Sequence, residues 1–294
     1  MKKTGIVADS HSGITQKQAA ELGIRVLPMP FYMNEECFYE DTTLTREEFF
    51  SRLEQGEKIS TSQASMEELM KIWDETLEEA EEILYFPISS GLSGSCSTAS
   101  VLAGEEKYEG KVFVVDNGRV ATPQHCAVLD ALDLVAQGYG AAEIKELLEK
   151  NKNQMSIYVA VDTLKYLKAG GRITPAAAAL GTMLKIKPVL QFDTGILGEF
   201  KKCRGLAKAK KAMIEAIQKD FETRFQESYQ KGKVHLMAAS SASEEETAKW
   251  VEEIKEAFPN MEVLCDPLSL GVCCHIGPGG LGIGCSCIPE PEHN

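Results

Sequence analysis

The chain has 294 residues, 26% of them charged and 44% hydrophobic, which is the composition of a folded globular protein long enough for two domains. Its formal net charge of -13 argues against nucleic acid or an anionic membrane as the main partner, because both require a positively charged surface. The N-terminal segment lacks the apolar core of a signal peptide, and the longest weakly polar run, residues 174–184, is too short to cross a bilayer. We therefore expect a cytoplasmic protein with no integral membrane segment, whose nine cysteines are mostly reduced.

The first half of the chain alternates short apolar runs, which are typical of buried strands, with stretches that have helical spacing or capping residues. Strands are expected at residues 4–8, 24–29, 83–88 and 112–115, and helices at residues 16–22, 45–53, 65–79, 122–137 and 141–151. This alternation predicts an α/β domain, residues 1–153, with a parallel sheet and helices on both of its faces.

The second half of the chain, residues 154–294, has a different order of elements. Strands are expected at residues 155–161, 189–192, 197–200, 234–238 and 262–265, and helices at residues 163–168, 174–184, 207–229 and 243–258. Two of these strands flank residues 193–195, whose sequence DTG is typical of a hairpin turn. A hairpin combined with long helices predicts a second α/β domain with a mixed sheet.

A serine-rich stretch, residues 89–100, has the sequence SSGLSGSCSTAS and is the strongest candidate for a binding loop. It follows an apolar run and leads into small residues that can continue as a helix, so we expect a strand-to-helix turn. Gly91 and Gly94 permit close approach of another group, while Ser93 and Ser95 place hydroxyls beside the free N–H groups of a helix start. Such a turn favours an anion, although a serine-capped helix without a ligand has the same pattern.

The same turn is similar to the nucleophile elbow of a serine hydrolase. Residues 91–95 read GLSGS, and Ser93 is followed along the chain by Asp266 and His275, in the order nucleophile, acid and base. The elbow pattern has a glycine where this chain has Ser95, and the sequence alone does not pair Asp266 with His275. An esterase-like hydrolase that uses Ser93, Asp266 and His275 is the alternative function.

Three further motifs have simpler structural interpretations. Residues 277–282 fit the pattern G-x-G-x-x-G, but too few residues follow for a dinucleotide-binding unit, so we interpret them as a rigid turn that positions His275. The cysteines at positions 273, 274, 285 and 287 lack the C-x-x-C spacing of structural zinc sites, and no metal is predicted. The basic segment 201–211 fits either an anionic partner or a solvated helix face.

Taken together, the motifs resemble those of the DegV family of bacterial fatty-acid-binding proteins. They follow the family's order and spacing over most of the chain, and they are Asp9-Ser10, Thr61-Ser62-Gln63 with Ser65, Ser89-Ser90, Leu92-Ser93-Gly94, Asp116, Leu164 with Tyr166-Leu167, Gly170-Gly171-Arg172-Ile173, Lys187-Pro188, Lys202 with Arg204, and His275 with Gly277-Pro278-Gly279. The sequence departs from the family's pattern at His11, Ala64, Ser95 and Ile276, where the usual residues are threonine, proline, threonine and threonine.

The resemblance implies a two-domain carrier that holds a long-chain fatty acid and is not itself an enzyme. The residues that it implies for the carboxylate are Thr61, Ser62, Ser93 and Gly94, with His275 nearby. The acyl chain would lie in a tunnel between or within the domains, which we assign to the second domain. Arg172 and Arg204 would contact a separate fatty acid kinase or the phosphorylated head group, and the acyl phosphate would enter phospholipid synthesis. The resemblance implies no cofactor.

Overall fold

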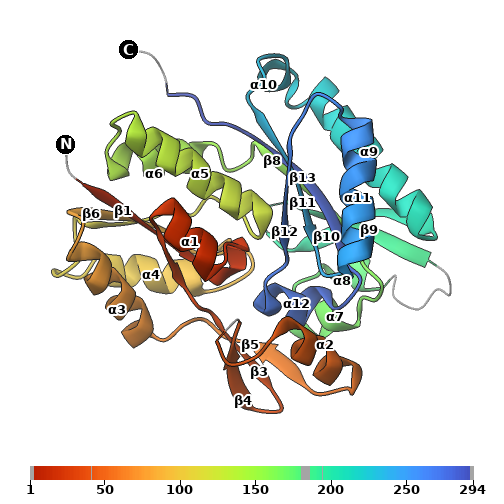
Figure 1. Ribbon diagram of the computed structural model, residues 1–294, viewed down its shortest axis with the longest axis horizontal. Coiled ribbons are helices and arrows are strands. Elements are labelled where there is room, and N and C mark those ends of the chain that lie inside the picture. Colours follow the sequence, from red (N-terminus) through yellow and green to blue (C-terminus); the bar gives the residue numbers. More distant parts are fainter. Residues whose placement is uncertain (1–2, 41, 180–185, 194, 292–294) are drawn as a thin grey trace. The chain divides into compact units, whose positions relative to one another are not determined.

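The structure, a computed structural model, describes residues 3–40, 42–179, 186–193 and 195–291. The chain forms two compact units. The first comprises the described parts of residues 1–152 and 289–294 together with residues 269–271, and the second comprises the described parts of residues 153–268 and 272–288. Each unit has its own sheet and hydrophobic core, whose helices and strands are labelled in Figure 1.

The main sheet of the first unit is parallel and has the strand order β2-β1-β6-β7. Its strands are β1 (Thr4–Asp9), β2 (Arg25–Leu27), β6 (Glu82–Phe86) and β7 (Val112–Val114). One face packs against α3 (Met66–Leu77) and α4 (Ser95–Ala103), and the other against α1 (Gln16–Leu22), α5 (Thr122–Ala136) and α6 (Ala141–Lys150). All residues of β6 are buried, as expected for a strand covered on both faces. The predicted parallel sheet with helices on both faces is confirmed.

The first unit also contains a three-stranded antiparallel sheet that the sequence did not lead us to expect. Its strands, in the order β4-β3-β5, are β3 (Pro30–Met33), β4 (Glu36–Tyr39) and β5 (Ile59–Thr61). Asn34 and Glu35 form the two-residue turn between β3 and β4, with positive φ angles of 48° and 73°. Helix α2 (Arg46–Glu54) packs on this sheet through Phe49, whose ring meets the Phe31 ring edge-on with 5.6 Å between centroids. The strand expected at residues 24–29 is therefore shorter than expected: β2 ends at Leu27, and the chain then enters β3 at Pro30.

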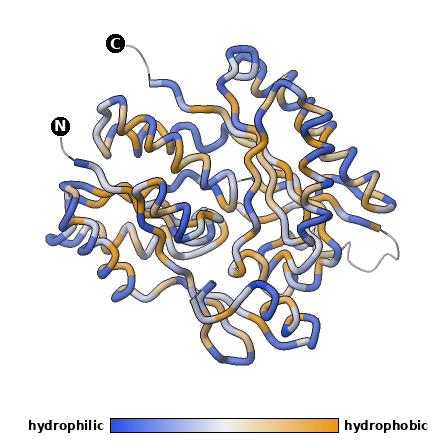
Figure 2. The backbone as a smooth tube through the Cα atoms, viewed as in Figure 1, coloured by the Kyte–Doolittle hydropathy of each residue, from blue (hydrophilic) through white to orange (hydrophobic). Residues whose placement is uncertain are grey.

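The second unit has a six-stranded mixed sheet with the order β10-β9-β8-β13-β11-β12. Its strands are β8 (Met155–Ala160), β9 (Ile186–Phe192), β10 (Leu197–Arg204), β11 (Val234–Ser240), β12 (Val263–Pro267) and β13 (Leu281–Cys287). Only the pair β11 and β12 is parallel among the described pairs, so the predicted mixed sheet is confirmed. Helices α9 (Leu206–Glu222) and α11 (Glu244–Ala257) pack on one face through a core that includes Met213, Ile217 and Trp250. Figure 2 shows hydrophobic colouring along the strands and hydrophilic segments on these two helices.

The short helices account for most of the remaining differences from the sequence predictions. They are η1 (Ser10–Ser12), α7 (Lys165–Gly170), α8 (Pro175–Ala178), α10 (Gln226–Gln230) and α12 (Leu270–Ile276). The single helix expected at residues 207–229 is two helices, because α9 ends at Glu222 and α10 begins at Gln226. Of the helix expected at residues 174–184, the described part is α8, and residues 180–184 lie outside the described residues, as does Thr194 of the expected hairpin turn. None of the described helices has the length and apolar character that a membrane span requires.

Candidate functional site

The loops that follow β1, β6 and β7 emerge at the carboxyl edge of the parallel sheet. In the order β2-β1-β6-β7, the chain moves from β1 to β2 in one direction and from β6 to β7 in the other. The strand order therefore reverses between β1 and β6, and the loops after these strands open a crevice at such a point. The turn that contains Ser93 follows β6, so the topology places the candidate binding loop at the usual ligand position of this fold class.

A buried carboxylate joins the ends of β1 and β6. Asp9 is fully buried, and its Oδ2 accepts a hydrogen bond from the Ile88 backbone N–H at 2.7 Å. Its Oδ1 accepts from the His11 backbone N–H at 3.1 Å and from the Gln124 side-chain amide at 3.0 Å. Three fixed donors meet a charge that would otherwise be costly to bury. Asp9 thus fixes the start of the Ser93 turn to the loop after β1.

The next residues of the turn, Ser89 and Ser90, form hydrogen bonds with the segment that follows β7. The Ser89 N–H donates to the Arg119 carbonyl at 2.9 Å. Both the N–H and the hydroxyl of Ser90 donate to the Asp116 carboxylate, at 3.3 and 2.7 Å. The Ser93 N–H then donates a hydrogen bond back to the Ser89 carbonyl at 3.2 Å. The backbone before Ser93 is therefore held by neighbouring strands of the sheet.

Helix α4 begins directly after Ser93. The Ser93 hydroxyl accepts from the Ser95 N–H at 3.2 Å and lies 2.9 Å from the Ser95 hydroxyl. Gly94 is the residue before the helix and supplies no side-chain cap. In the part of the chain that the structure describes, no acceptor meets the N–H groups of Cys96 and Ser97. The start of α4 thus combines hydroxyls with free backbone donors and has no acidic residue in its first turn, which suits a small anion.

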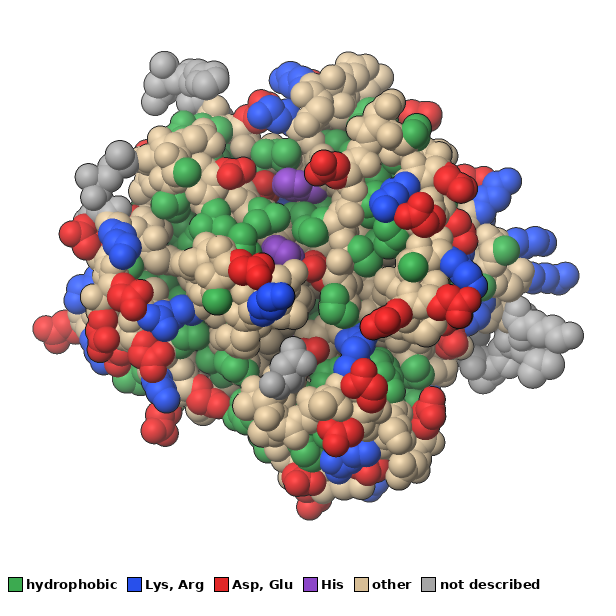
Figure 3. All heavy atoms as spheres, in the orientation of Figure 1, with side chains coloured by type: hydrophobic (Ala, Val, Ile, Leu, Met, Phe, Trp, Pro, Cys, Tyr) green, Lys and Arg blue, Asp and Glu red, His purple; other side chains and the backbone are tan. Residues whose placement is uncertain are grey.

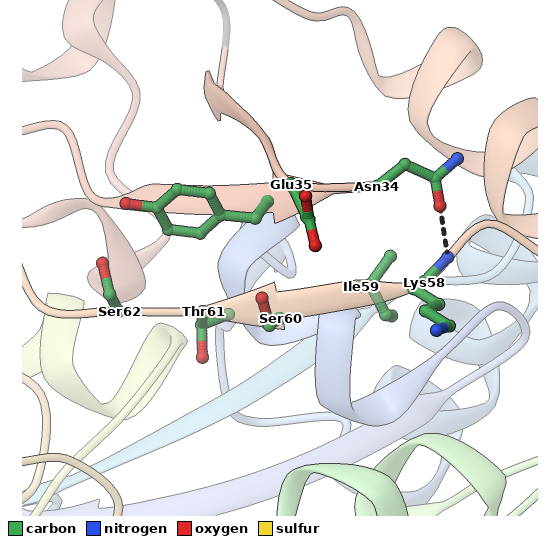
Figure 4. Close-up of a pocket in the computed structure, with 8 residues that line it drawn as sticks. Asn34, Glu35, Lys58, Ile59, Ser60, Thr61 and Ser62 are labelled. Atoms are coloured by element: carbon green, nitrogen blue, oxygen red, sulfur yellow. Dashed lines mark hydrogen bonds between the residues drawn. The ribbon is translucent and has the colours of Figure 1, made fainter.

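The segment 61–63 reaches the same helix. Gln63 Oε1 accepts a hydrogen bond from the Thr98 hydroxyl at 3.0 Å and lies 3.5 Å from where a Cβ at position 94 would be. Thr61 and Ser62 line an open hollow of about 880 Å³ beside β3 and β5. Figure 4 shows the Ser60 and Thr61 side chains on opposite sides of β5, with Ser62 at the end of the strand nearest the following loop. Gln63 therefore links the segment that carries Thr61 and Ser62 to the start of α4 at Gly94, through a contact that the sequence analysis did not identify.

His275 belongs to the second unit and lies on α12. Its imidazole packs against Gly170 so closely that a side chain at position 170 would collide with it. The glycine loop 277–280 follows α12 and leads into β13, so it has neither the preceding strand nor the following helix of a dinucleotide site. Its N–H groups are used internally: the Gly277 N–H donates to the Cys273 carbonyl at 2.8 Å, and the Gly280 N–H to the Ser241 hydroxyl at 2.9 Å. This loop is a rigid turn after the helix that carries His275.

The two candidate partner-contact arginines lie at opposite ends of β10. The Leu197 N–H at the start of β10 donates to the Arg172 carbonyl at 3.1 Å, whereas Arg204 is exposed at the end of the strand. Seven residues of extended chain separate these ends by roughly 23 Å. The structure therefore does not bring the two arginines together.

The basic segment 201–211 is partly neutralised by acidic neighbours. Lys202 pairs with Glu199 at 3.5 Å and Lys210 with Glu253 at 2.8 Å. Figure 3 shows acidic and basic side chains interspersed over the visible face, with several basic ones at the edge near α9. Arg204 itself has no ion pair among the described residues. The segment is thus closer to a solvated mixed surface than to a strong positive patch.

The remaining candidates are buried. Asp266 lies in β12 at 2% exposure, opposite Ala239 of β11. All nine cysteines are free thiols, and the described residues contain no cluster of three or more potential metal ligands. Burial raises the pKa of Cys265 to about 11 and that of Cys285 well above its ordinary value, so these thiols stay protonated at neutral pH.

Fold and loop geometry define a class of two-unit α/β proteins with an anion-compatible helix start at the carboxyl edge of a parallel sheet. This chain belongs to the DegV family, because the family model "Uncharacterised protein, DegV family COG1307" matches residues 3–287. It is 30% identical over 287 residues to Protein DegV of Bacillus subtilis, with 96% of this chain and 98% of that protein covered. It is 29% identical over 289 residues to a DegV domain-containing protein of Clostridium perfringens, with 96% and 97% covered.

Two solved structures of the family are similar over almost the whole chain. A DegV family protein from Thermus thermophilus, described as binding fatty acid, has a TM-score of 0.86 at 29% identity, with 97% of this chain and 99% of that one covered. DegV of Bacillus subtilis, described as a fatty acid binding protein, has a TM-score of 0.82 at 26% identity, with 98% and 100% covered. The resemblance found in the motifs is confirmed at the level of family and fold.

Proposed function

We propose that this protein binds a long-chain fatty acid, holds its carboxylate at the start of α4, and presents it to a separate fatty acid kinase. The observation that carries the proposal is the fixed turn before α4, with the Ser93 hydroxyl and the free N–H groups of Cys96 and Ser97. The fatty acid bound by the Thermus thermophilus and Bacillus subtilis relatives supplies the ligand class.

The chemistry of these donors suits a carboxylate that must remain reactive. A carboxylate taken out of water needs fixed donors, and neutral hydroxyls and amides provide them without neutralising its charge. In this proposal Ser93, Gly94, Thr61 and Ser62 supply the donors, and the resemblance adds His275 to the residues assigned to the carboxylate. An acyl chain with about 14 buried methylenes would gain roughly 11 kcal/mol before the costs of association, so the chain provides most of the affinity.

The separate kinase partner is what the resemblance to the DegV family implies. The glycine loop 277–280 uses its N–H groups internally and is followed by a strand, so it is not a phosphate-binding loop. This loop gives no reason to place the phosphoryl transfer on this chain, and we assign the transfer to a separate protein. We assign Arg172 and Arg204 to the surface that meets this partner or the phosphorylated head group.

The hydrolase alternative requires a general base on Ser93. Within the first unit, the described hydrogen-bond partner of the Ser93 hydroxyl is Ser95, which is not a base. This observation favours the carrier role, in which Ser93 is a ligand donor.

Ligand content tests the proposal. The purified protein should release a long-chain fatty acid into organic solvent, detected by mass spectrometry, and the stripped protein should bind added oleate or palmitate. Absence of lipid together with failure to bind either acid would refute it. Replacing Arg204 by alanine should lower acyl phosphate formation with the kinase and leave oleate binding within about twofold, whereas Lys211→Ala, at a lysine paired with Glu215, is the matched control.

A further inference from the structure

A three-part contact at Asp116 holds the turn that leads to Ser93. Asp116 follows β7, and its side chain is 29% exposed. Its Oδ1 accepts from the Ser90 N–H at 3.3 Å, and its Oδ2 accepts from the Ser90 hydroxyl at 2.7 Å. The Lys152 ammonium lies 2.7 Å from the same Oδ2. One carboxylate thus binds both polar groups of Ser90 and one cation.

Asp116 is itself fixed by the helix behind it. Its backbone N–H donates to Glu149 Oε1 at 2.9 Å, and Glu149 also pairs with Lys145 one turn earlier on α6. Helix α6 is anchored in the core of the first unit through Ile144 and Leu148, both of which are buried. The position of Ser90 is therefore fixed, through Asp116, to a helix that is anchored in the core of the first unit.

The residues between Ser90 and α4 need such an anchor. Gly91 and Gly94 flank Ser93, and glycine has more backbone conformations available than other residues. Among the described residues, the Ser93 N–H bonds only to a near neighbour in sequence, the Ser89 carbonyl, at 3.2 Å. A turn with two glycines would sample several arrangements of the Ser93 hydroxyl unless a neighbour held one of them.

The charge of Asp116 is compatible with a nearby anion only because it is balanced. Burial raises the pKa of Asp116, but hydrogen bonds from Lys152 and Ser90 lower it by more, so its pKa lies below the ordinary value. Asp116 is thus ionised at neutral pH and carries Lys152 as its counter-ion. Both features suit a group that holds the loop and does not touch the ligand.

From these contacts we propose that Asp116 is a positioning residue for carboxylate recognition, acting through Ser90 to fix the turn that carries Ser93. This inference rests on the proposed function. Preorganised donors bind more tightly because the ligand need not order them, so loss of the contact should weaken binding of the head group. The acyl chain, which does not use these donors, should be unaffected.

The test compares two ligands with the same chain, oleate and oleyl alcohol. In Asp116→Ala and Ser90→Ala, the affinity for oleate should fall about fivefold, the factor that corresponds to one hydrogen bond of roughly average strength, while the affinity for oleyl alcohol changes less than about twofold. Ser90→Thr keeps the N–H and the hydroxyl and should restore oleate binding. Asp74→Ala is the matched control, because Asp74 likewise accepts from a hydroxyl, that of Tyr108 at 3.0 Å, and from a cation, Lys107 at 2.7 Å.

Each outcome of this comparison supports or overturns the positioning role of Asp116. An equal loss for oleate and oleyl alcohol, or a loss for oleate as large in Asp74→Ala, would mean that Asp116 only stabilises the fold and would overturn the proposal. Unchanged oleate affinity in both variants would also overturn it. If Asp116→Ala does not fold, Ser90→Ala removes only a hydroxyl and gives the answer. Failure of the wild-type protein to bind oleate at all would instead refute the proposed function, on which this inference rests.

Discussion

The serine-rich turn at residues 89–95 and the glycine loop at residues 277–280 look alike in sequence and behave differently in the structure. Both are short, contain glycines and adjoin a helix. The serine-rich turn precedes its helix, α4, and leaves the N–H groups of Cys96 and Ser97 without described partners. The glycine loop follows its helix, α12, and returns the Gly277 N–H to the Cys273 carbonyl.

The direction of the helix explains the difference. A helix start exposes N–H groups that a ligand can use, whereas a helix end exposes carbonyls that the next residues must satisfy. Gly277 has a φ of 75°, the left-handed conformation that commonly ends a helix. A glycine pattern therefore indicates an anion site only when a helix follows it, which is why the G-x-G-x-x-G letters at residues 277–282 carry no nucleotide chemistry.

The largest expected effect is a loss of stability when a residue of the glycine loop is replaced. In Gly277→Ala, a Cβ would collide with the Tyr166 ring, and the φ of 75° would be strained. We expect a loss of about 3 kcal/mol in the free energy of unfolding, from overpacking and the left-handed backbone together. Urea unfolding of the variant measures it. Gly198→Ala is the control, since a Cβ there meets only the Gln191 carbonyl at 3.9 Å, and an equally stable Gly277→Ala would show that the loop is not rigid.

The next effect concerns binding at the serine-rich turn. Ser93→Ala removes one hydrogen bond to a charged group, so oleate affinity should fall by about 1.5 to 3 kcal/mol, or roughly tenfold to a hundredfold. Isothermal titration with stripped protein measures it. Ser100→Ala, on the same helix, removes a hydroxyl that bonds the Cys96 carbonyl at 2.8 Å and should leave affinity unchanged. Covalent labelling of wild-type Ser93 by a fluorophosphonate probe would instead make it a nucleophile.

The fold was predictable where burial and periodicity agree. The apolar run at residues 83–86 of β6 and the capping boxes before α2 and α3 identify these elements from local sequence. The strands β3, β4 and β5 have only three or four residues each, too few to show the alternation of a strand, and β4 and β5 also have exposed positions. Strand β13 escaped prediction because Gly282 and Gly284 weaken the strand pattern, although every residue of it is buried.

The site was predictable only where it is local. Ser93 and Gly94 are adjacent in sequence, and their position after an apolar run predicts the turn. Thr61 and Ser62 came from the family resemblance, since their approach to α4 depends on the contact of Gln63 with Thr98, 35 residues further along the chain. The family motifs include both Asp116 and Ser90, 26 residues earlier, but no sequence pattern pairs the two. Side-chain contacts between distant segments follow from the packing of the sheet, which the sequence pattern does not specify.

The smallest effect tests how strongly the helix start acts on its own thiol. Cys96 lies in the first turn of α4, where free N–H groups normally lower a thiol pKa. Burial opposes this and, together with the negative charge of Asp116, raises the pKa of Cys96 to about 11. At pH 8 almost all of this thiol is therefore protonated, and iodoacetamide should label it far more slowly than the exposed Cys37.

Asp116→Asn separates the two causes. Removing the Asp116 charge should lower the Cys96 pKa slightly and raise its labelling rate a few-fold, because burial is the larger cause and is unchanged. Timed labelling followed by peptide mass spectrometry measures both thiols in one sample. The buried Cys273, on α12 before the glycine loop, should label equally slowly in the wild-type protein and in the variant. Wild-type Cys96 that labels as fast as Cys37 would mean that the N–H groups of α4 outweigh burial, and the anion site would then be stronger than its hydrogen bonds suggest.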